Sequence, residues 1–137
     1  MRAKLFLLFI FLICAALVYA VWQKEMVLKN GQTFYMELRP TDPRSLMQGD
    51  YMALRYAEDS FCLKLDDKNI ARAYECDRCI CKIVLKHKPD SFFFQEGHAE
   101  IYSRAKYAIL KGSDNGVQIT SVLLAGLADE NLKELKP

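Results

Sequence analysis

An unbroken apolar run near the N-terminus constrains this chain more than any other feature. Leu5 to Trp22 is 18 residues long and contains no charged or strongly polar side chain. At ~1.5 Å of rise per residue, a helix of that length spans about 27 Å, which is close to the hydrocarbon thickness of a bilayer. Because a helix satisfies its own backbone in lipid, the run predicts a transmembrane helix over residues 5–22, with the bilayer as its partner.

The charges around this run predict an orientation. Arg2 and Lys4 precede it, and basic residues favour the cytoplasmic side of a membrane. Tyr19 and Trp22 lie at its other end, where aromatic rings favour the interface. We therefore expect a single-pass protein of the inner or plasma membrane, with a cytoplasmic N-terminus and an extracytoplasmic C-terminal domain. A cleaved signal peptide is the alternative, and it also exports the chain from about residue 23.

Length and charge limit what the exported part can be. The whole chain has 137 residues, which suits one domain. Its net charge is +2, and without Arg2 and Lys4 the remaining residues comprise 17 basic and 17 acidic side chains. This charge balance gives no strong electrostatic case for nucleic-acid binding, for which a basic patch or a high pI is typical, so no nucleic-acid partner is expected.

The pattern after the apolar run divides the chain into three parts. Residues 1–22 form the cytoplasmic start and the anchor, and residues 23–31 form a juxtamembrane helical stalk that ends at Asn30-Gly31. Residues 32–137 form the extracytoplasmic domain. Its first residues alternate, with Phe34, Met36 and Leu38 on one face, which predicts a half-buried strand.

Similar alternation predicts the rest of the domain. Met52, Leu54 and Tyr56 share one face of a second strand. Further expected elements are a strand over 61–65, a hairpin of 70–74 with 79–86, a helix over 95–105, and a hairpin of 107–110 with 117–124. The predicted fold class is α+β: an N-terminal transmembrane helix and a mainly antiparallel β domain with one or two short helices.

Two stretches resemble a known family. Gly49, Asp50, Tyr51, Leu54 and Tyr56 occupy the five named positions of the signature of the GDYXXLXY family of bacterial membrane-anchored proteins. The flanking residues Asp42, Pro43, Arg44, Gln95, Glu96 and Gly97 are similar to further parts of its pattern. The resemblance implies an N-terminal anchor, an extracytoplasmic domain, no established activity and no cofactor, with a membrane protein as partner.

The signature admits two interpretations. In the architectural one, Pro43 and Gly49 shape a loop, and Arg44 pairs with Asp50 to lock it. In the other, Arg44, Asp50, Tyr51 and Tyr56 form a recognition surface, since Arg and Tyr are common interface anchors. The anchor, the missing catalytic constellation and the family resemblance together predict a membrane-tethered binding or assembly module of the cell envelope that is not an enzyme.

An enzyme is the alternative function. A membrane anchor followed by a serine-bearing loop is similar to type I signal peptidases, which would make Ser45 the nucleophile and Lys64 or Lys82 the base. The sequence departs from that family, because no Ser-Met-x-Pro motif surrounds Ser45.

Four cysteines lie in the exported part: Cys62, Cys76, Cys79 and Cys81. Exported cysteines favour disulfides, and the expected pairs are Cys76 with Cys79 and Cys62 with Cys81. A cysteine-based metal or redox module is the alternative, because four thiolates suit tetrahedral zinc and Cys76-x-x-Cys79 has redox spacing.

The run Phe92-Phe93-Phe94 is expected to be a core strand. Successive side chains of a strand point to opposite faces, so the three rings cannot all point inward. One of them is expected to contact a membrane or a partner.

Overall fold

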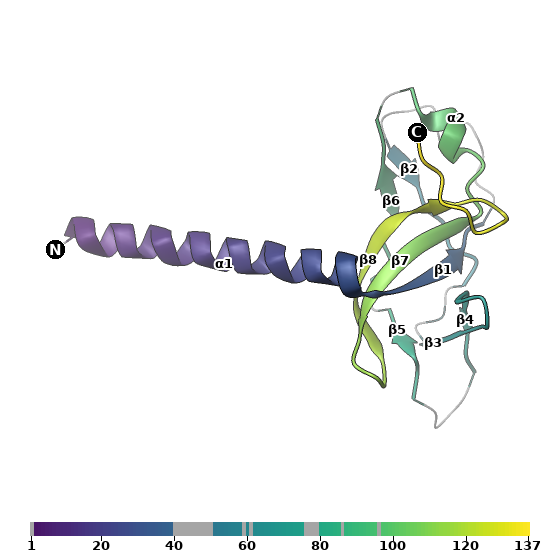
Figure 1. Ribbon diagram of the computed structural model, residues 1–137, viewed down its shortest axis with the longest axis horizontal. Helices are drawn as coiled ribbons and strands as arrows, with labels where there is room; N and C mark the ends of the chain where they lie inside the picture. Colours follow the sequence, from purple (N-terminus) through teal and green to yellow (C-terminus); the bar gives the residue numbers. More distant parts are fainter. Residues whose placement is uncertain are drawn as a thin grey trace.

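A computed structural model describes residues 2–39, 51–58, 60, 62–75, 80–85, 87–95 and 97–137. The elements follow in the order α1 (Arg2–Asn30), β1 (Gln32–Glu37), β2 (Tyr51–Ala53), β3 (Cys62–Leu65), β4 (Ala71–Ala73), β5 (Ile83–Val84), β6 (Ser91–Phe93), α2 (Ala99–Tyr102), β7 (Tyr107–Asp114) and β8 (Ile119–Ala128). Figure 1 shows a long helix that leads into a β-rich domain. The predicted α+β class is confirmed.

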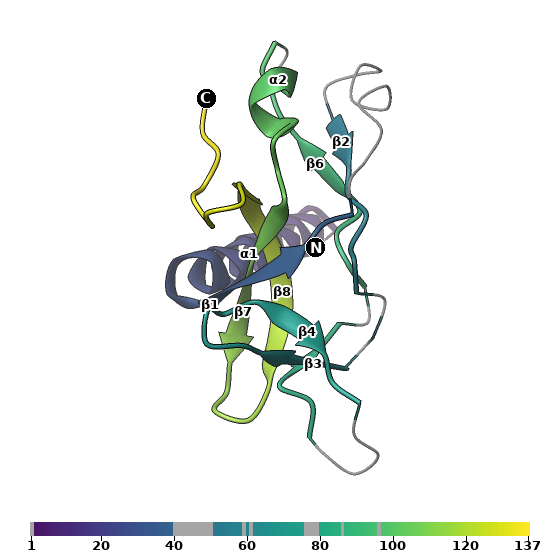
Figure 2. The ribbon, with the colours of Figure 1, turned by 90° about the vertical axis from the view of Figure 1, so that its right-hand side faces the viewer.

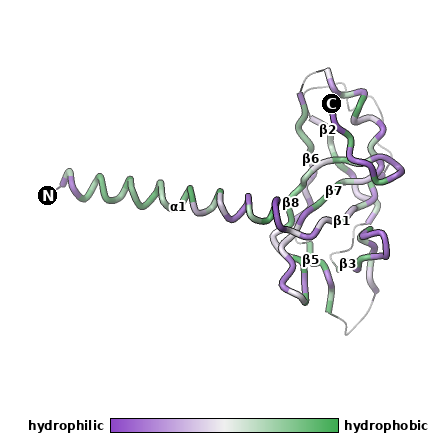
Figure 3. The backbone as a smooth tube through the Cα atoms, viewed as in Figure 1, coloured by the Kyte–Doolittle hydropathy of each residue, from purple (hydrophilic) through white to green (hydrophobic). Residues whose placement is uncertain are grey.

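The helix α1 joins the predicted anchor and the predicted stalk in one element of 29 residues. None of its residues is buried, and it is long and apolar enough to cross a membrane. Figure 3 shows that its apolar character extends along the part remote from the domain. The helix ends where Asn30-Gly31 predicts, and the Gly31 N–H donates to the Val27 carbonyl at 2.8 Å.

The described residues of the domain include a six-stranded sheet in the order β1-β7-β8-β5-β3-β4. Neighbouring strands are antiparallel except β5 and β8, which are parallel. The two ends of the sheet meet, because Tyr35 of β1 bridges to Ile70 and its N–H donates to the Asn69 carbonyl at 2.8 Å. The sheet therefore curves into a small barrel, which Figure 2 shows with α1 behind it.

The barrel core follows from the alternation of the strands. Phe34 and Met36 of β1 are 0% and 1% exposed, as their period of two predicts. The largest fully buried side chains come from β1, β3, β5, β7 and β8: Phe34, Met36, Leu63, Ile83, Leu110, Ile119 and Leu127. These side chains form one cluster that fills the barrel.

A second, two-stranded sheet lies beside the barrel. Its strands β2 and β6 are antiparallel, and α2 follows β6 (Figure 1). Its inner face is continuous with the core through Met52 and Phe92. The inner side chains of β2, the strand that carries the signature, thus hold it on the barrel, and its outer face is exposed to solvent.

Two predicted elements are wrong in part. The expected hairpin of 70–74 with 79–86 does not form, because β3 lies between β4 and β5. Residues 71–73 pair with β3 instead, through a tight turn in which the Asn69 N–H donates to the Asp66 carbonyl at 2.8 Å and Asn69 has a φ of 59°.

The predicted helix over 95–105 is also wrong in its length. Of the described residues in this range, Ala99–Tyr102 alone are helical, because Gly97 has a φ of +88° and breaks the start of the helix. The hairpin of β7 and β8 is confirmed, with longer strands than predicted.

The end of α1 is fixed to the barrel. The Lys111 ammonium donates to the Leu28 carbonyl at 2.8 Å. A Cβ at Gly31 would overlap the Val27 carbonyl oxygen and lie 2.9 Å from the Gly112 carbonyl oxygen, so only glycine fits this close approach. The helix thus enters the domain directly, with its last turn against β7 and β8.

Candidate functional site

Part of the predicted site lies outside the described residues. These positions are Asp42, Pro43, Arg44, Ser45, Gly49, Asp50, Cys76, Cys79 and Glu96. The signature is therefore described from Tyr51 onward, and the predicted pairing of Arg44 with Asp50 stays a prediction.

The described signature residues divide between two faces of one segment. Leu54 and Tyr56 are 6% and 7% exposed and belong to the core. Tyr51 is 48% exposed. The spacing explains this split, because Tyr51 is an odd number of residues from Leu54 and Tyr56 and so points to the opposite face of the strand.

Tyr56 holds the segment onto the domain. Its hydroxyl donates to the Pro89 carbonyl at 2.6 Å, and the Lys88 ammonium lies 5.9 Å from its ring centroid. Burial raises the pKa of the Tyr56 hydroxyl, and the nearby Asp90 charge raises it further. The phenol therefore stays neutral and donates its hydrogen bond. The architectural interpretation fits Tyr56.

Tyr51 lies next to an aromatic side chain of the neighbouring strand. It faces Phe93 directly in the register of β2 and β6, and the two ring centroids are 6.0 Å apart. Phe93 is 73% exposed, the highest exposure among the described large apolar residues of the domain after α1. We call Tyr51 and Phe93 the aromatic ledge. Of the described signature residues, Tyr51 is the one that is exposed as the recognition interpretation requires, and the ledge is the surface that it forms with Phe93.

The other rings of the phenylalanine run support the ledge from behind. Phe92 and Phe94 lie 5.1 Å and 5.2 Å from the Tyr102 ring, centroid to centroid. Both are partly buried against the core. The predicted outward ring of the run is thus Phe93. Pairing it with Tyr51 required the register of two strands that are remote in sequence, which alternation alone does not reveal.

The second block of the family pattern forms a turn. The Gln95 carbonyl accepts a hydrogen bond from the His98 N–H at 3.2 Å, and Gly97 adopts a left-handed φ of +88°. A glycine is suited to this conformation because it has no Cβ. Gln95 and Gly97 therefore shape the connection from β6 to α2.

One predicted disulfide is present. Cys62 and Cys81 are bonded, with their Cα atoms 5.2 Å apart. The bond joins β3 to the residues that enter β5, and these two strands are neighbours. A sulfur in a disulfide does not act as a thiolate ligand, so this bond uses two members of the alternative zinc set. Among the described residues no cluster of three or more His, Cys, Asp or Glu suits a metal ion.

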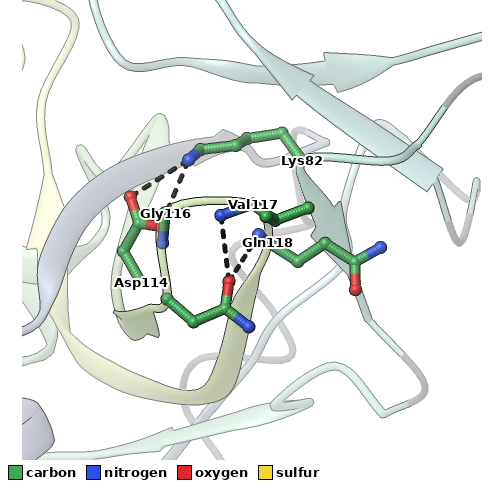
Figure 4. Close-up of polar contacts among 6 residues, drawn as sticks. Lys82, Asp114, Gly116, Val117 and Gln118 are labelled. Atoms are coloured by element: carbon green, nitrogen blue, oxygen red, sulfur yellow. Dashed lines mark hydrogen bonds and ion pairs between the residues drawn. The ribbon is translucent and has the colours of Figure 1, made fainter.

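The two candidate lysine bases have other contacts. Lys64 lies over the Tyr74 ring, with its ammonium 5.6 Å from the centroid. The Lys82 ammonium pairs with Asp114 at 3.0 Å, as Figure 4 shows. Hydrogen bonds from the Gly116 N–H and from Lys82 lower the pKa of Asp114. Lys82 thereby fastens the turn between β7 and β8.

The comparison with protein families gave one match. The sequence model described as GDYXXLXY protein matches residues 13–123, which is most of the chain. No curated protein and no solved structure shows a significant match.

Proposed function

This chain belongs to the GDYXXLXY family, and we propose that it is a membrane-anchored, extracytoplasmic binding or assembly module of the bacterial cell envelope. Its partner is a second membrane protein beside the anchor. The observation that carries the proposal is the aromatic ledge of Tyr51 and Phe93, which exposes two large rings on the signature strand and its neighbour.

The helix α1 supports the membrane location. Its side chains from Leu5 to Trp22 are exposed, for example Phe11 at 72% and Leu7 at 65%. A soluble monomer rarely exposes a continuous apolar surface of this extent. The bilayer covers it. The Arg2 and Lys4 charges favour a cytoplasmic N-terminus, and the Cys62–Cys81 bond is typical of an oxidising compartment outside the cytoplasm.

The ledge has the chemistry of a protein contact. Tyr and Phe are enriched at the centres of interfaces, because a rigid ring buries much area at little entropic cost. The ledge also lies on a sheet beside the barrel, away from the axis of α1 (Figure 1). The fixed joint between α1 and β7 keeps it in one position relative to the anchor. A neighbouring membrane protein is the partner that this position suits.

Co-purification tests the proposal. The full chain is expressed in its native membrane, extracted in a mild detergent and purified. We expect a stoichiometric membrane protein to co-purify, and the double variant Tyr51→Ala with Phe93→Ala to lose it. The matched control is Val117→Ala, which truncates a 58% exposed apolar residue on the turn between β7 and β8. Retention of the partner by the double variant, with folding intact, contradicts the proposal.

The topology is tested separately. Protease added to intact spheroplasts should digest the barrel, and the same protease should leave it intact in inverted vesicles. The mass of the purified chain distinguishes the anchor from a cleaved signal peptide, because the anchor retains residues 1–22. A protected barrel in spheroplasts would contradict the proposed orientation.

A further inference from the structure

The strand β8 has a long edge without a neighbouring strand. It runs from Ile119 to Ala128 and pairs along its length with β7. On its other side β5 meets it at Ile83↔Ile119, and the C-terminal tail meets it at Ala128↔Glu134. Between these two contacts, residues 120–126 pair with no second strand in the part of the chain that the structure describes.

Two local features produce this opening. The strand β5 has two residues, Ile83 and Val84, and the chain after it leads away to Asp90, whose carbonyl accepts the Leu54 N–H at 2.7 Å. On the opposite side Ser121 has a φ of 52°, and the register of β7 with β8 shifts beside it. Such a bulge bends a strand, so β8 turns away from the line of β5.

A groove lies at the end of the opening nearest β5, where it reaches residues 120–122 of β8. Its volume is about 440 Å³. It is lined from the β5 side and from the β8 side by Val84, Leu85, His87, Gln118, Thr120, Ser121 and Val122. Val84, Leu85 and Val122 make it apolar, and the other four side chains are polar. The groove therefore combines a strand edge, apolar contacts and hydrogen-bonding side chains.

We propose that this groove binds an extended segment of a protein partner, which adds to the free edge of β8 as a further strand. An unpaired strand edge offers alternating N–H and C=O groups, and an extended peptide supplies the complementary groups. Lipid tails have no N–H or C=O groups, and the backbone N–H and C=O groups of a helix are already hydrogen-bonded to one another. The apolar lining would receive alternate side chains of the added strand.

The recessed shape favours a peptide over a second copy. The edge lies in a groove between β5 and β8, and the same walls flank it on every copy. Two recessed edges cannot approach to the ~4.8 Å spacing of paired strands. A single extended segment is thin enough to enter. This inference rests on the proposed binding function, but it concerns a surface distinct from the aromatic ledge.

The probe is a displayed library of random twelve-residue peptides, selected on the full chain in lipid nanodiscs. We expect enriched peptides with alternating apolar residues and without a central proline. Binding should slow amide hydrogen exchange at residues 120–126. Val84→Lys places a charge in the groove and should weaken binding by about tenfold or more. The matched control, Val117→Lys, lies outside the groove and should leave the affinity unchanged.

Thr120→Lys is a second groove variant, at an exposed position, in case Val84→Lys disturbs folding. Its effect should match that of Val84→Lys. The ledge variant Tyr51→Ala with Phe93→Ala should bind the selected peptides normally, which separates this inference from the proposed function. Three results would overturn the inference: peptides that bind both groove variants as well as the wild type, protection of 120–126 by lipid alone, or protection that rises with protein concentration without peptide.

Discussion

The barrel and the two-stranded sheet beside it use aromatic side chains in opposite ways. The barrel sheet curves until Tyr35 meets Ile70, and it buries Phe34 completely. The small sheet buries Phe92 and Phe94 only in part and leaves Phe93 at the surface. A two-stranded sheet is marginal in water, so it depends on its inner face for attachment. The barrel thus supplies the stability, and the small sheet supplies an exposed surface.

The largest expected difference concerns two phenylalanines. Phe34→Ala leaves a cavity in a completely buried site and should lower the free energy of unfolding by about 3–5 kcal/mol. Phe93→Ala removes an exposed ring and should change it by no more than about 0.5 kcal/mol. Urea unfolding of the full chain in detergent, followed by near-UV circular dichroism, measures both. Equal losses would break the distinction between the two regions.

The disulfide should matter next, and only for the barrel. Cys62 and Cys81 are separated by 19 residues in sequence, and closing a loop of that size typically stabilises a fold by about 3 kcal/mol. The double variant Cys62→Ala with Cys81→Ala should lose that amount while keeping partner co-purification at low temperature. Cys14→Ala is the control, because this exposed free cysteine lies on α1. An unchanged urea midpoint in the double variant would contradict the prediction.

Two tyrosines of the signature should differ by a smaller amount. Tyr56→Phe removes the hydrogen bond to the Pro89 carbonyl and should cost about 1–2 kcal/mol of folding free energy. Tyr51→Phe keeps the exposed ring and should leave stability unchanged. Thermal unfolding of the two variants side by side tests this. A larger loss for Tyr51→Phe would reverse the roles assigned to the two residues.

The smallest effect should be a pH dependence in the turn between β7 and β8. The pKa of Asp114 is lowered by its hydrogen bonds from Gly116 and Lys82. Its contribution is therefore present above the ordinary pKa of an aspartate and is lost as pH falls through the lowered value. Asp114→Asn should slightly lower the unfolding temperature at neutral pH, where the wild type keeps the interaction, and leave it unchanged at acid pH, so the acid limb of the plot against pH flattens. An identical acid limb would show that the pair does not stabilise the turn.

Local patterns predicted much of the fold. The alternation in residues 34–38 and 52–56 identified the buried faces, and Asn30-Gly31 identified the end of α1. Non-local choices were less predictable. The partner of residues 71–73 depended on which of two turns closed, and the Cys62–Cys81 pair was predicted together with a hairpin that does not form. The bond is present because β3 and β5 are neighbours.

The candidate site divides in the same way. The signature and the outward ring of the phenylalanine run were visible in the sequence, but the contact between Tyr51 and Phe93 depends on the register of β2 with β6. No pattern in the sequence indicates the groove at β8, because the residues of a strand do not show whether another strand pairs with its edge. Its lining residues come from two segments that meet only in the barrel.

The sequence by itself determined the long apolar helix, the family and the faces of the strands, because each follows from residues close together along the chain. Hydrophobic length and a period of two are local properties. Only the tertiary structure decided which strands are neighbours, which signature tyrosine is buried and where the edge of β8 stays open. These depend on how distant segments share one core, since a strand's outer face and edge are defined by what packs beside them.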